Sequence, residues 1–387
     1  MTKRDYPYYP PKLISKINKT LKSGKVNYWT GNEGILFEKE FSNYVGNKYS
    51  IAVSNGSIAL EIALKALNLK KKDEIIVTPR SFVISASCVI NLGLKPVFAD
   101  VDLNGNLSIE GIKKCYNKKV KAIIVVHLNG LPCNLNPIIN FTKKNKIKLI
   151  EDCSQAHGAK YKNKSVGSFG DISTWSFCQD KIISTGGEGG MITTNNEEIY
   201  KKIWSFKDHG KSFTKMKEKN NKSGYRYIHD NLGSNFRLTE MQSAIGRIQI
   251  KKLDLWTQKR RENALFLQNS LSQCKLIRIP LPGKEIIHAW YKFNCFINKE
   301  FLKEDWSRDK IIKAINEKGY PAFQGGCSEL YLEKCFNKKS TNPFNNLLVA
   351  KELGETNLTF LVHPTINKIV MSNYALNIRE VLNLACK

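Results

Sequence analysis

Residues 121–126 (KAIIVV) and 147–151 (IKLIE) are short apolar runs, and a segment with a helical pattern, 134–145, lies between them. Short runs of this kind separated by an amphipathic segment predict a βαβ unit, in which a helix joins two parallel strands. Strands that are apolar on both faces are typical of a parallel sheet with helices on each side. This stretch therefore predicts an α/β fold.

The same alternation continues outward on both sides of this unit. Further strands are expected at 50–53, 74–78, 95–99 and 172–177, and further helices at 57–68, 82–92 and 108–116. The crossover lengths suit right-handed connections between parallel strands. We therefore expect a large domain that is built on a mostly parallel sheet flanked by helices.

The pattern changes in the last third of the chain. Residues 237–270 form a long helical pattern, and a strand-like run at 289–297 and a helical run at 305–319 follow it. A length of 387 residues fits two domains. We expect three parts: an N-terminal segment (1–25) that packs on the small domain or over the site entrance, the large domain (26–250) and a smaller C-terminal α+β domain (251–387).

The net charge of the chain is unusual, because 61 Lys+Arg against 34 Asp+Glu give +27. One explanation is an anionic partner: nucleic acid, a membrane surface or a phosphorylated substrate. The favoured explanation is compositional, since Lys is abundant throughout and Arg, which bidentate phosphate and base recognition prefers, is scarce. We therefore expect no nucleic-acid partner, although a basic surface would attract a nucleotide-linked substrate.

The ten cysteines occur without a C-x-x-C pair or a zinc-ligand spacing. Reduced core thiols and no metal site are the expectation. The basic N-terminus lacks the apolar segment of a signal peptide, and no run approaches the ~18 apolar residues of a membrane helix. The sequence therefore predicts a cytoplasmic protein without membrane insertion.

Two motifs at the ends of expected strands offer candidate site residues. In VSNGSIAL (53–60) a helix begins at Ser57, so its first N–H groups would hold an anion, and Gly56 lets the backbone come close. A plain N-capped helix is the simpler explanation of that motif alone. Asp152, in IEDCSQAHGA (150–159), follows a strand where ligands bind in open α/β sheets, and a cap or turn role is equally possible. The side chain of the adjacent Glu151 would point to the opposite side of the strand from Asp152.

Lys181 stands out because a strand-like run precedes it and TGGEGG (185–190) follows it. Such glycines permit close backbone approach, whereas an ordinary lysine lies on the surface. Phe82 is either a flat partner for a bound ring or a core side chain. An anion cradle, a carboxylate, a lysine and a flat partner are the groups that pyridoxal phosphate (PLP) requires.

With these motifs in place, the sequence resembles the DegT/DnrJ family of PLP-dependent nucleotide-sugar aminotransferases, which have the aspartate-aminotransferase-type fold (fold type I). The resemblance runs from YWTGNEGILFEKEFSNYVG, near residue 28, through NFRLTEMQSAIGRIQIKKL, near residue 253, and weakly into LVHPTI. VSNGSIAL, PVFADVD, AIIVVHLNGLP, IEDCSQAHGA, VGSFGDISTWSF and TGGEGGM keep the order and spacing of the family. This joint order makes the resemblance specific.

The resemblance implies a role for each matching residue. Lys181 would carry PLP covalently, Asp152 would pair with the ring nitrogen, and Gln155 would contact the ring hydroxyl. Phe82 would lie on the ring face. The phosphate ligands would be Gly56, Ser57 and Ser176, with Asn235 from the other subunit of a homodimer. The candidates for the sugar and nucleotide end are Trp29, Thr30, Glu188 and Arg226, and each has an equally good structural explanation.

Three features depart from the family pattern. Asn129 stands where the family often has Tyr, and TGGEGGM (185–191) has one glycine more than usual. Asp180 precedes the lysine, where Asn is common. These changes bear on the sugar preference more than on the type of reaction.

The resemblance implies transfer of an amino group from an amino acid, L-glutamate, to a nucleotide-linked keto-deoxysugar for surface polysaccharide, such as lipopolysaccharide, or another glycan. Two alternatives keep the fold: an aminotransferase for a cyclitol ketone, and a PLP-dependent sugar dehydratase. Lys181 argues against the dehydratase, because those relatives have His at this position. A nucleic-acid-binding regulator is the least favoured alternative.

Overall fold

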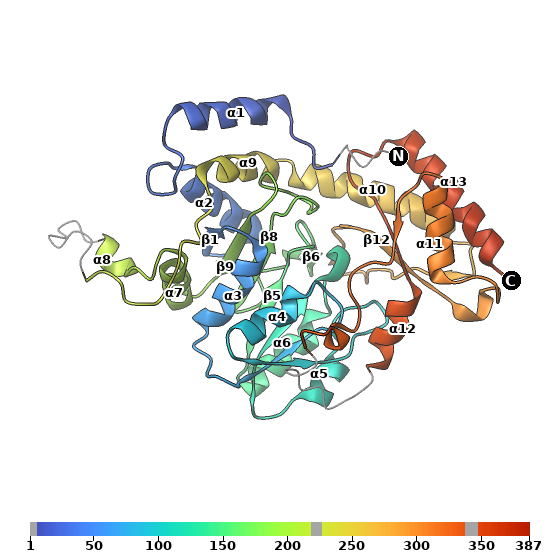
Figure 1. Cartoon of the computed structure of the whole chain (residues 1–387), viewed down its shortest axis with the longest axis horizontal. Coiled ribbons are helices and arrows are strands. Elements are labelled where there is room, and N and C mark those ends of the chain that lie inside the picture. Colours follow the sequence, from blue (N-terminus) through green and yellow to red (C-terminus); the bar gives the residue numbers. More distant parts are fainter. Residues whose placement is uncertain (1–5, 218–226, 337–346) are drawn as a thin grey trace.

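The computed structural model describes residues 6–217, 227–336 and 347–387, and a seven-stranded sheet forms the centre of its larger part (Figure 1). The strand order is β1-β9-β8-β5-β4-β2-β3. The strands are β1 (Tyr49–Val53), β2 (Glu74–Val77), β3 (Lys95–Phe98), β4 (Val120–Val126), β5 (Lys148–Asp152), β8 (Ile172–Ser176) and β9 (Gly190–Thr194). Neighbours from β3 to β8 pair in parallel, and β9 pairs antiparallel with β8 and β1. The predicted mostly parallel α/β sheet is confirmed.

Helices cover both faces of this sheet, as the apolar strands require. They are α2 (Glu33–Val45), α3 (Gly56–Ala66), α4 (Ile84–Asn91), α5 (Ile109–Cys115), α6 (Leu135–Asn145), α7 (Glu197–Lys207) and the short α8 (Phe213–Lys217). From Ala122 to Val126, β4 is completely buried, because neighbouring side chains pack against helices on opposite faces. The predicted strand at 121–126 and helix at 134–145 agree with β4 and α6 to within one residue.

A second, four-stranded antiparallel sheet lies in the C-terminal part, in the order β10-β12-β14-β13. Its strands are β10 (Ile277–Arg278), β12 (Phe293–Ile297), β13 (Ala322–Phe323) and β14 (Asn357–Phe360). Helices α11 (Arg308–Glu317) and α13 (Lys368–Ala385) pack against it, and α12 (Leu348–Thr356) turns back to the core of the large sheet. A small third sheet joins β6 (Lys160–Tyr161), β7 (Lys164–Ser165) and β11 (Ile286–Ile287). The two main sheets fall within the two predicted domains, and we propose those boundaries for the chain.

The long helical pattern at 237–270 corresponds to two helices and not to a single one. They are α9 (Glu240–Ile250) and α10 (Leu253–Leu271), separated by a turn at residues 251–252. Thr239 delays the start of α9, since its hydroxyl caps the helix in a capping box with Gln242. Ile250 and Leu253 are both buried on the two sides of the break. The apolar periodicity of the sequence therefore continues across the turn, and the break between the two helices cannot be predicted from it.

The N-terminal segment contacts both parts of the molecule, since the Tyr6 ring stacks on that of His363 at 5.4 Å and lies 4.9 Å from the Arg260 guanidinium. Helix α1 (Pro11–Lys22) runs along α9 (Figure 1). Before it, the hydroxyl of Tyr6 donates to the backbone carbonyl of Lys181 at 2.8 Å and to that of Ile182. The start of the chain thus contacts the loop that carries the candidate lysine. Among the described residues, no helix has the length and apolarity to cross a bilayer.

Candidate active site

A cavity of about 530 Å³ lies at the carboxyl ends of the central strands. Eight of the predicted site residues line it: Gly56, Ser57, Phe82, Asp152, Gln155, Ser176, Lys181 and Glu188. They come from four separate stretches of the chain, at residues 56–57, 82, 152–155 and 176–188. The structure therefore brings together the candidates that the sequence motifs offered one at a time.

The first helical turn of α3 forms one wall of this cavity. Asn55 caps the helix, because its side-chain oxygen accepts the N–H of Ile58 at 2.9 Å. A Cβ at Gly56 would lie 2.6 Å from the Cβ of Ser176, so this position has room only for glycine. The free N–H groups and positive dipole end of α3 thus face a space that fits an anion.

Asp152 ends β5 and is 4% exposed. One carboxylate oxygen accepts the N–H of Ser154 at 3.0 Å. Burial raises the pKa of Asp152, and the bonds to Ser154 and the charge of Lys181 act in the opposite direction. A buried carboxylate of this kind is stabilised by a cation, and a protonated ring nitrogen would supply one.

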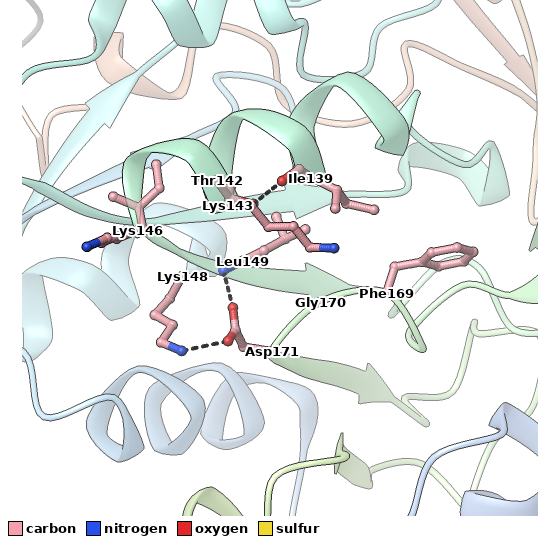
Figure 2. A pocket seen from close by; sticks show the side chains of 10 residues that line it. Ile139, Thr142, Lys143, Lys146, Lys148, Leu149, Phe169, Gly170 and Asp171 are labelled. Carbon is pink, nitrogen blue, oxygen red and sulfur yellow. Dashed lines mark hydrogen bonds and ion pairs between the residues drawn. The ribbon is translucent and has the colours of Figure 1, made fainter.

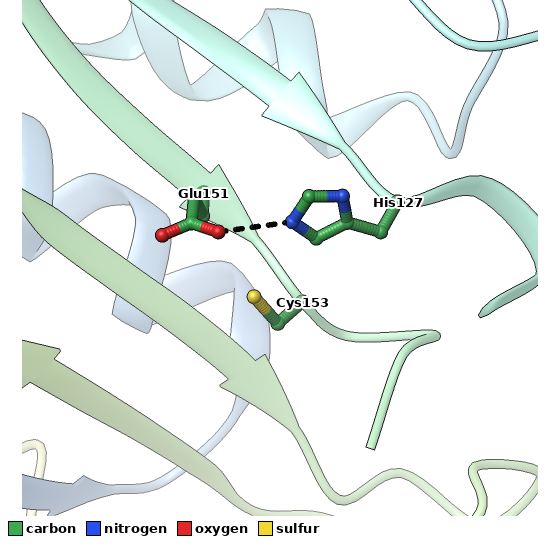
Figure 3. Close-up of side chains that lie close together, drawn as sticks. All are labelled: His127, Glu151 and Cys153. Carbon is green, nitrogen blue, oxygen red and sulfur yellow. Dashed lines mark hydrogen bonds and ion pairs between the residues drawn. The ribbon is translucent and has the colours of Figure 1, made fainter. Parts of the chain in front are cut away.

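Glu151 points to the opposite side of β5, as predicted, and belongs to a buried network (Figure 3). Its carboxylate bonds to His127 Nε2 at 3.1 Å and accepts the N–H groups of Gly167 and Gly170. Burial alone would raise the pKa of Glu151, but these partners outweigh it and hold the pKa below its usual value. His127 Nδ1 accepts the N–H of Cys133. Because both ring nitrogens of His127 and both carboxylate oxygens of Glu151 already have hydrogen-bond partners, these two side chains form a structural network beside Cys153.

Lys181 lies in a loop after β8, and its side chain is 16% exposed. Its Nζ is 3.5 Å from a carboxylate oxygen of Asp180 and 5.0 Å from the centre of the Tyr291 ring. The Tyr291 hydroxyl donates to Asp180. Burial alone would raise the pKa of Asp180, but the Lys181 charge and the Tyr291 bond lower it. Asp180, the departure beside the lysine, therefore links Lys181 to the C-terminal part of the chain.

Gln155 and Phe82 complete the walls of the cavity. The side-chain oxygen of Gln155 accepts the N–H of Asn129 at 2.7 Å, which leaves its amide NH₂ to donate to a ligand oxygen. Asn129 has a positive φ of 55°, a conformation that asparagine tolerates better than tyrosine. Phe82 is 66% exposed, so the explanation of Phe82 as a core side chain is wrong. An exposed aromatic ring on a cavity wall suits a flat ligand.

Three of the described candidate residues, Trp29, Thr30 and Asn235, do not line this cavity. The indole N–H of Trp29 donates to Asp208 at 2.8 Å, and Thr30 bonds to Asn27. Asn235 is exposed and accepts the N–H of Arg237. Arg226 lies outside the described residues. The hydrogen bond to Asp208 therefore supports the structural explanation of Trp29.

A second cavity of about 300 Å³ adjoins the first and shares Ser81, Phe82, Gln155, Asp180 and Lys181 with it. Its far wall comes from the C-terminal part, where Tyr291, Lys292 and residues 325–327 lie. Sequence patterns missed Tyr291 and Lys292, because they lie more than 100 residues from Lys181. The only sequence pattern that included these two residues was the strand-like run at 289–297, which says nothing about a site.

Another hollow, of about 370 Å³, lies at the amino end of β5 (Figure 2). Lysines 143, 146 and 148 line it, and Lys148 pairs with Asp171 at 2.7 Å. It holds none of the predicted site residues and lies at the opposite end of β5 from Asp152. The candidate active site is therefore the pair of cavities around Lys181.

His157 is a completely buried histidine beside this site, with its ring 5.3 Å from Trp175 and 5.6 Å from Phe177. Burial lowers the pKa of His157 to about 3. The unfolded chain binds this proton below pH ~6.5, whereas the folded protein binds it only near pH 3, so stability falls as the pH falls through this window. The slope is up to about 1.4 kcal/mol per pH unit.

We expect His157→Gln to remove this dependence, because glutamine does not titrate. Between about pH 7 and about pH 5, the wild type should lose roughly 2 kcal/mol more unfolding free energy than the variant. Urea unfolding at both pH values measures this difference. Equal losses in the two proteins would contradict a neutral buried His157.

A buried carboxylate, a lysine and a helix N-terminus around one cavity, on a mostly parallel sheet, are the arrangement of a PLP-dependent enzyme of fold type I. The DegT/DnrJ/EryC1/StrS aminotransferase family matches residues 10–371. The chain belongs to this family.

Known proteins agree with this assignment. GDP-perosamine synthase from Escherichia coli O157:H7 is 34% identical over 314 residues, which cover 79% of this chain and 83% of the relative. The crystal structure of an aminotransferase from Psychrobacter cryohalolentis has a TM-score of 0.96 and 44% identity over 98% of both chains. GDP-4-keto-6-deoxymannose-3-dehydratase, with a trapped PLP-glutamate geminal diamine, has a TM-score of 0.88 and 28% identity over 98% of this chain and all of that one.

These findings confirm the predicted fold, the enzyme class and PLP as the cofactor that this family uses. They also show that a sugar dehydratase shares the fold. The fold by itself therefore does not distinguish amino transfer from dehydration.

Proposed function

We propose that this chain transfers an amino group from L-glutamate to a nucleotide-linked keto-deoxysugar, and that the product serves surface polysaccharide or another glycan. The observation that carries the proposal is that Lys181, Asp152 and the N-terminus of α3 line one cavity. The nucleotide sugar is suggested by the GDP-perosamine synthase relative. Lys181 favours amino transfer over dehydration.

The residues of the cavity fit PLP. Bound PLP supplies an electron sink that stabilises negative charge on the carbon next to the reacting nitrogen. In our proposal Lys181 carries the aldehyde, and the buried Asp152 keeps the ring nitrogen protonated. Gln155 donates to the ring hydroxyl, and Phe82 covers the ring face. Gly56, Ser57 and Ser176 hold the phosphate at the N-terminus of α3.

Lys181 has a second task once the donor amine displaces it. Its Nζ would then be free to act as the base that accepts the proton from the α-carbon of the donor and returns it when the new amine forms. Amination of the sugar would use the same proton transfer by Lys181 in the reverse direction. Because Asp180 holds a carboxylate 3.5 Å from Nζ, the lysine keeps its place after its release.

The assembly and location are also part of the proposal. We propose a cytoplasmic homodimer in which Asn235 of the partner subunit reaches the phosphate, since Asn235 is exposed and does not line the cavity of its own chain. Glu188, at the rim of the cavity, is our candidate for sugar contact. The roles of Trp29, Thr30 and Arg226 in substrate binding stay predictions.

The function can be tested by loading the enzyme with pyridoxamine phosphate and adding keto-sugar nucleotides one by one. Return of the aldehyde absorbance identifies the acceptor. A response to cyclitol ketones alone would support the alternative aminotransferase. A deoxygenated sugar product would support the dehydratase.

Gly56 offers a direct test of the phosphate cradle. Gly56→Ala places a Cβ against Ser176, so we expect PLP affinity to fall by roughly ten-fold or more, since each 1.4 kcal/mol is a factor of ten. PLP titration followed by absorbance measures this. The control is Gly283→Ala, because a Cβ there meets nothing within 4 Å. If both variants bind PLP with equal affinity, the N-terminus of α3 does not hold the phosphate.

A further inference from the structure

The second cavity brings a lysine of the C-terminal part close to the reacting lysine. Lys292 directly precedes β12 and lines this cavity together with Asp180 and Lys181. Its Nζ lies 3.9 Å from one oxygen of Asp180, and Lys181 Nζ lies 3.5 Å from the other. One carboxylate thus sits between two ammonium groups.

The ammonium group of Lys292 is poorly satisfied where it stands. The 3.9 Å contact to Asp180 is longer than a hydrogen bond, and no hydrogen bond joins Nζ to another residue in the described part of the chain. The side chain is 30% exposed, and Nζ lies 5.0 Å from the Tyr291 ring centre and 5.8 Å from that of Phe323. Burial lowers the pKa of Lys292, and Asp180 opposes this effect. A partly desolvated cation with free N–H donors favours an added anion.

The proposed reaction needs an anion at this place. The amine of an α-amino acid has to reach the position of Lys181 Nζ, and its carboxylate is bonded to the same carbon as that amine. Lys181 and Lys292 are the cationic side chains among the described residues that line the cavity. Arg260 is 1% exposed, and its guanidinium donates to the backbone carbonyl of Tyr291.

We propose that Lys292 binds the α-carboxylate of the amino donor, in competition with Asp180. This inference rests on the proposed function and assigns the donor end of that site. Asp180 then has two effects: it holds Lys181 in place, and it occupies the carboxylate position until a donor arrives. With 52% of its side chain exposed, Asp180 has room to turn away from Lys292 while it stays beside Lys181.

Binding of glutarate tests the proposal, because this dicarboxylate lacks an amine and cannot react. Calorimetric titration into the PLP-bound enzyme should give a Kd roughly 10- to 100-fold higher for Lys292→Met, the loss expected for one charge-assisted hydrogen bond. Asp180→Asn removes the competing charge and should tighten glutarate binding. Lys299→Met is the control, since it removes the same charge from an exposed site after β12.

Titration with L-glutamate, followed by the loss of the aldehyde absorbance, provides the second readout. Lys292→Met should need more glutamate by the same factor, with an unchanged KM for the keto-sugar nucleotide. Unchanged glutarate and glutamate binding overturns the inference, as does a selective rise in the keto-sugar KM. Lys292→Gln gives the same test if Lys292→Met does not fold. A wild-type enzyme that shows no change with any amino acid would instead contradict the proposed function.

Discussion

Lys181→Ala is expected to abolish the covalent attachment of PLP and to reduce amino transfer by at least about 10²- to 10⁴-fold, the contribution of one acid–base group. Lys181 is the one lysine among the described residues that lines the larger cavity, so we expect no neighbouring lysine there to replace it. The measurements are the absorbance band near the visible and the mass of the lysine peptide after borohydride reduction. The wild type should carry the reduced cofactor on the peptide with Lys181.

Lys292→Ala is the matched control for this experiment. Its Nζ contacts the same Asp180 carboxylate, but it lines only the adjoining cavity. We expect this variant to keep the absorbance band. If the band survives in Lys181→Ala, another lysine holds the cofactor, and the assignment of the site is wrong.

Asp152→Asn is expected to lower turnover by roughly 10²- to 10³-fold, the range for removal of one preorganised electrostatic group, while PLP still binds. Asparagine keeps the shape of the side chain but cannot stabilise a protonated ring nitrogen. Half-reaction rates with L-glutamate and PLP absorbance measure the two effects. Near-normal turnover would contradict the role of Asp152.

Stability separates this chemical effect from a folding defect. Burial raises the pKa of Asp152, so the ionised carboxylate costs folding free energy without a cationic partner. The neutral variant without PLP should therefore unfold at a temperature no lower than that of the wild type. Asp171→Asn is the control for the loss of a carboxylate, because Asp171 lies at the other end of β5.

Much of the large sheet could be predicted from local patterns. Strands β4 and β5 are apolar runs that need burial on both faces, and their periodicity is visible in the sequence. The two-residue period of β5 also separates Glu151 from Asp152, and the structure confirms that they face opposite sides. These features depend on near neighbours in the chain.

Other features depend on distant partners and left no such signal. Strand β9 lies in the run after TGGEGG, and its antiparallel pairing with β1 joins residues about 140 positions apart. The contacts of Asp180 with Tyr291 and Lys292 likewise join two parts of the chain. The motif order suggested the cofactor residues, whereas only the tertiary structure places Tyr291 and Lys292 beside Lys181.

The bonds from Tyr6 to the loop of Lys181 have a consequence for how this protein is handled. Tyr6 is made about 175 residues before its acceptor carbonyls, so these contacts form only after the large sheet has been synthesised. The backbone of the loop that carries Lys181 therefore receives two of its hydrogen bonds from the beginning of the polypeptide. We expect an affinity tag fused directly ahead of Tyr6 to disturb this contact, whereas a tag after α13 is far from it in the sequence.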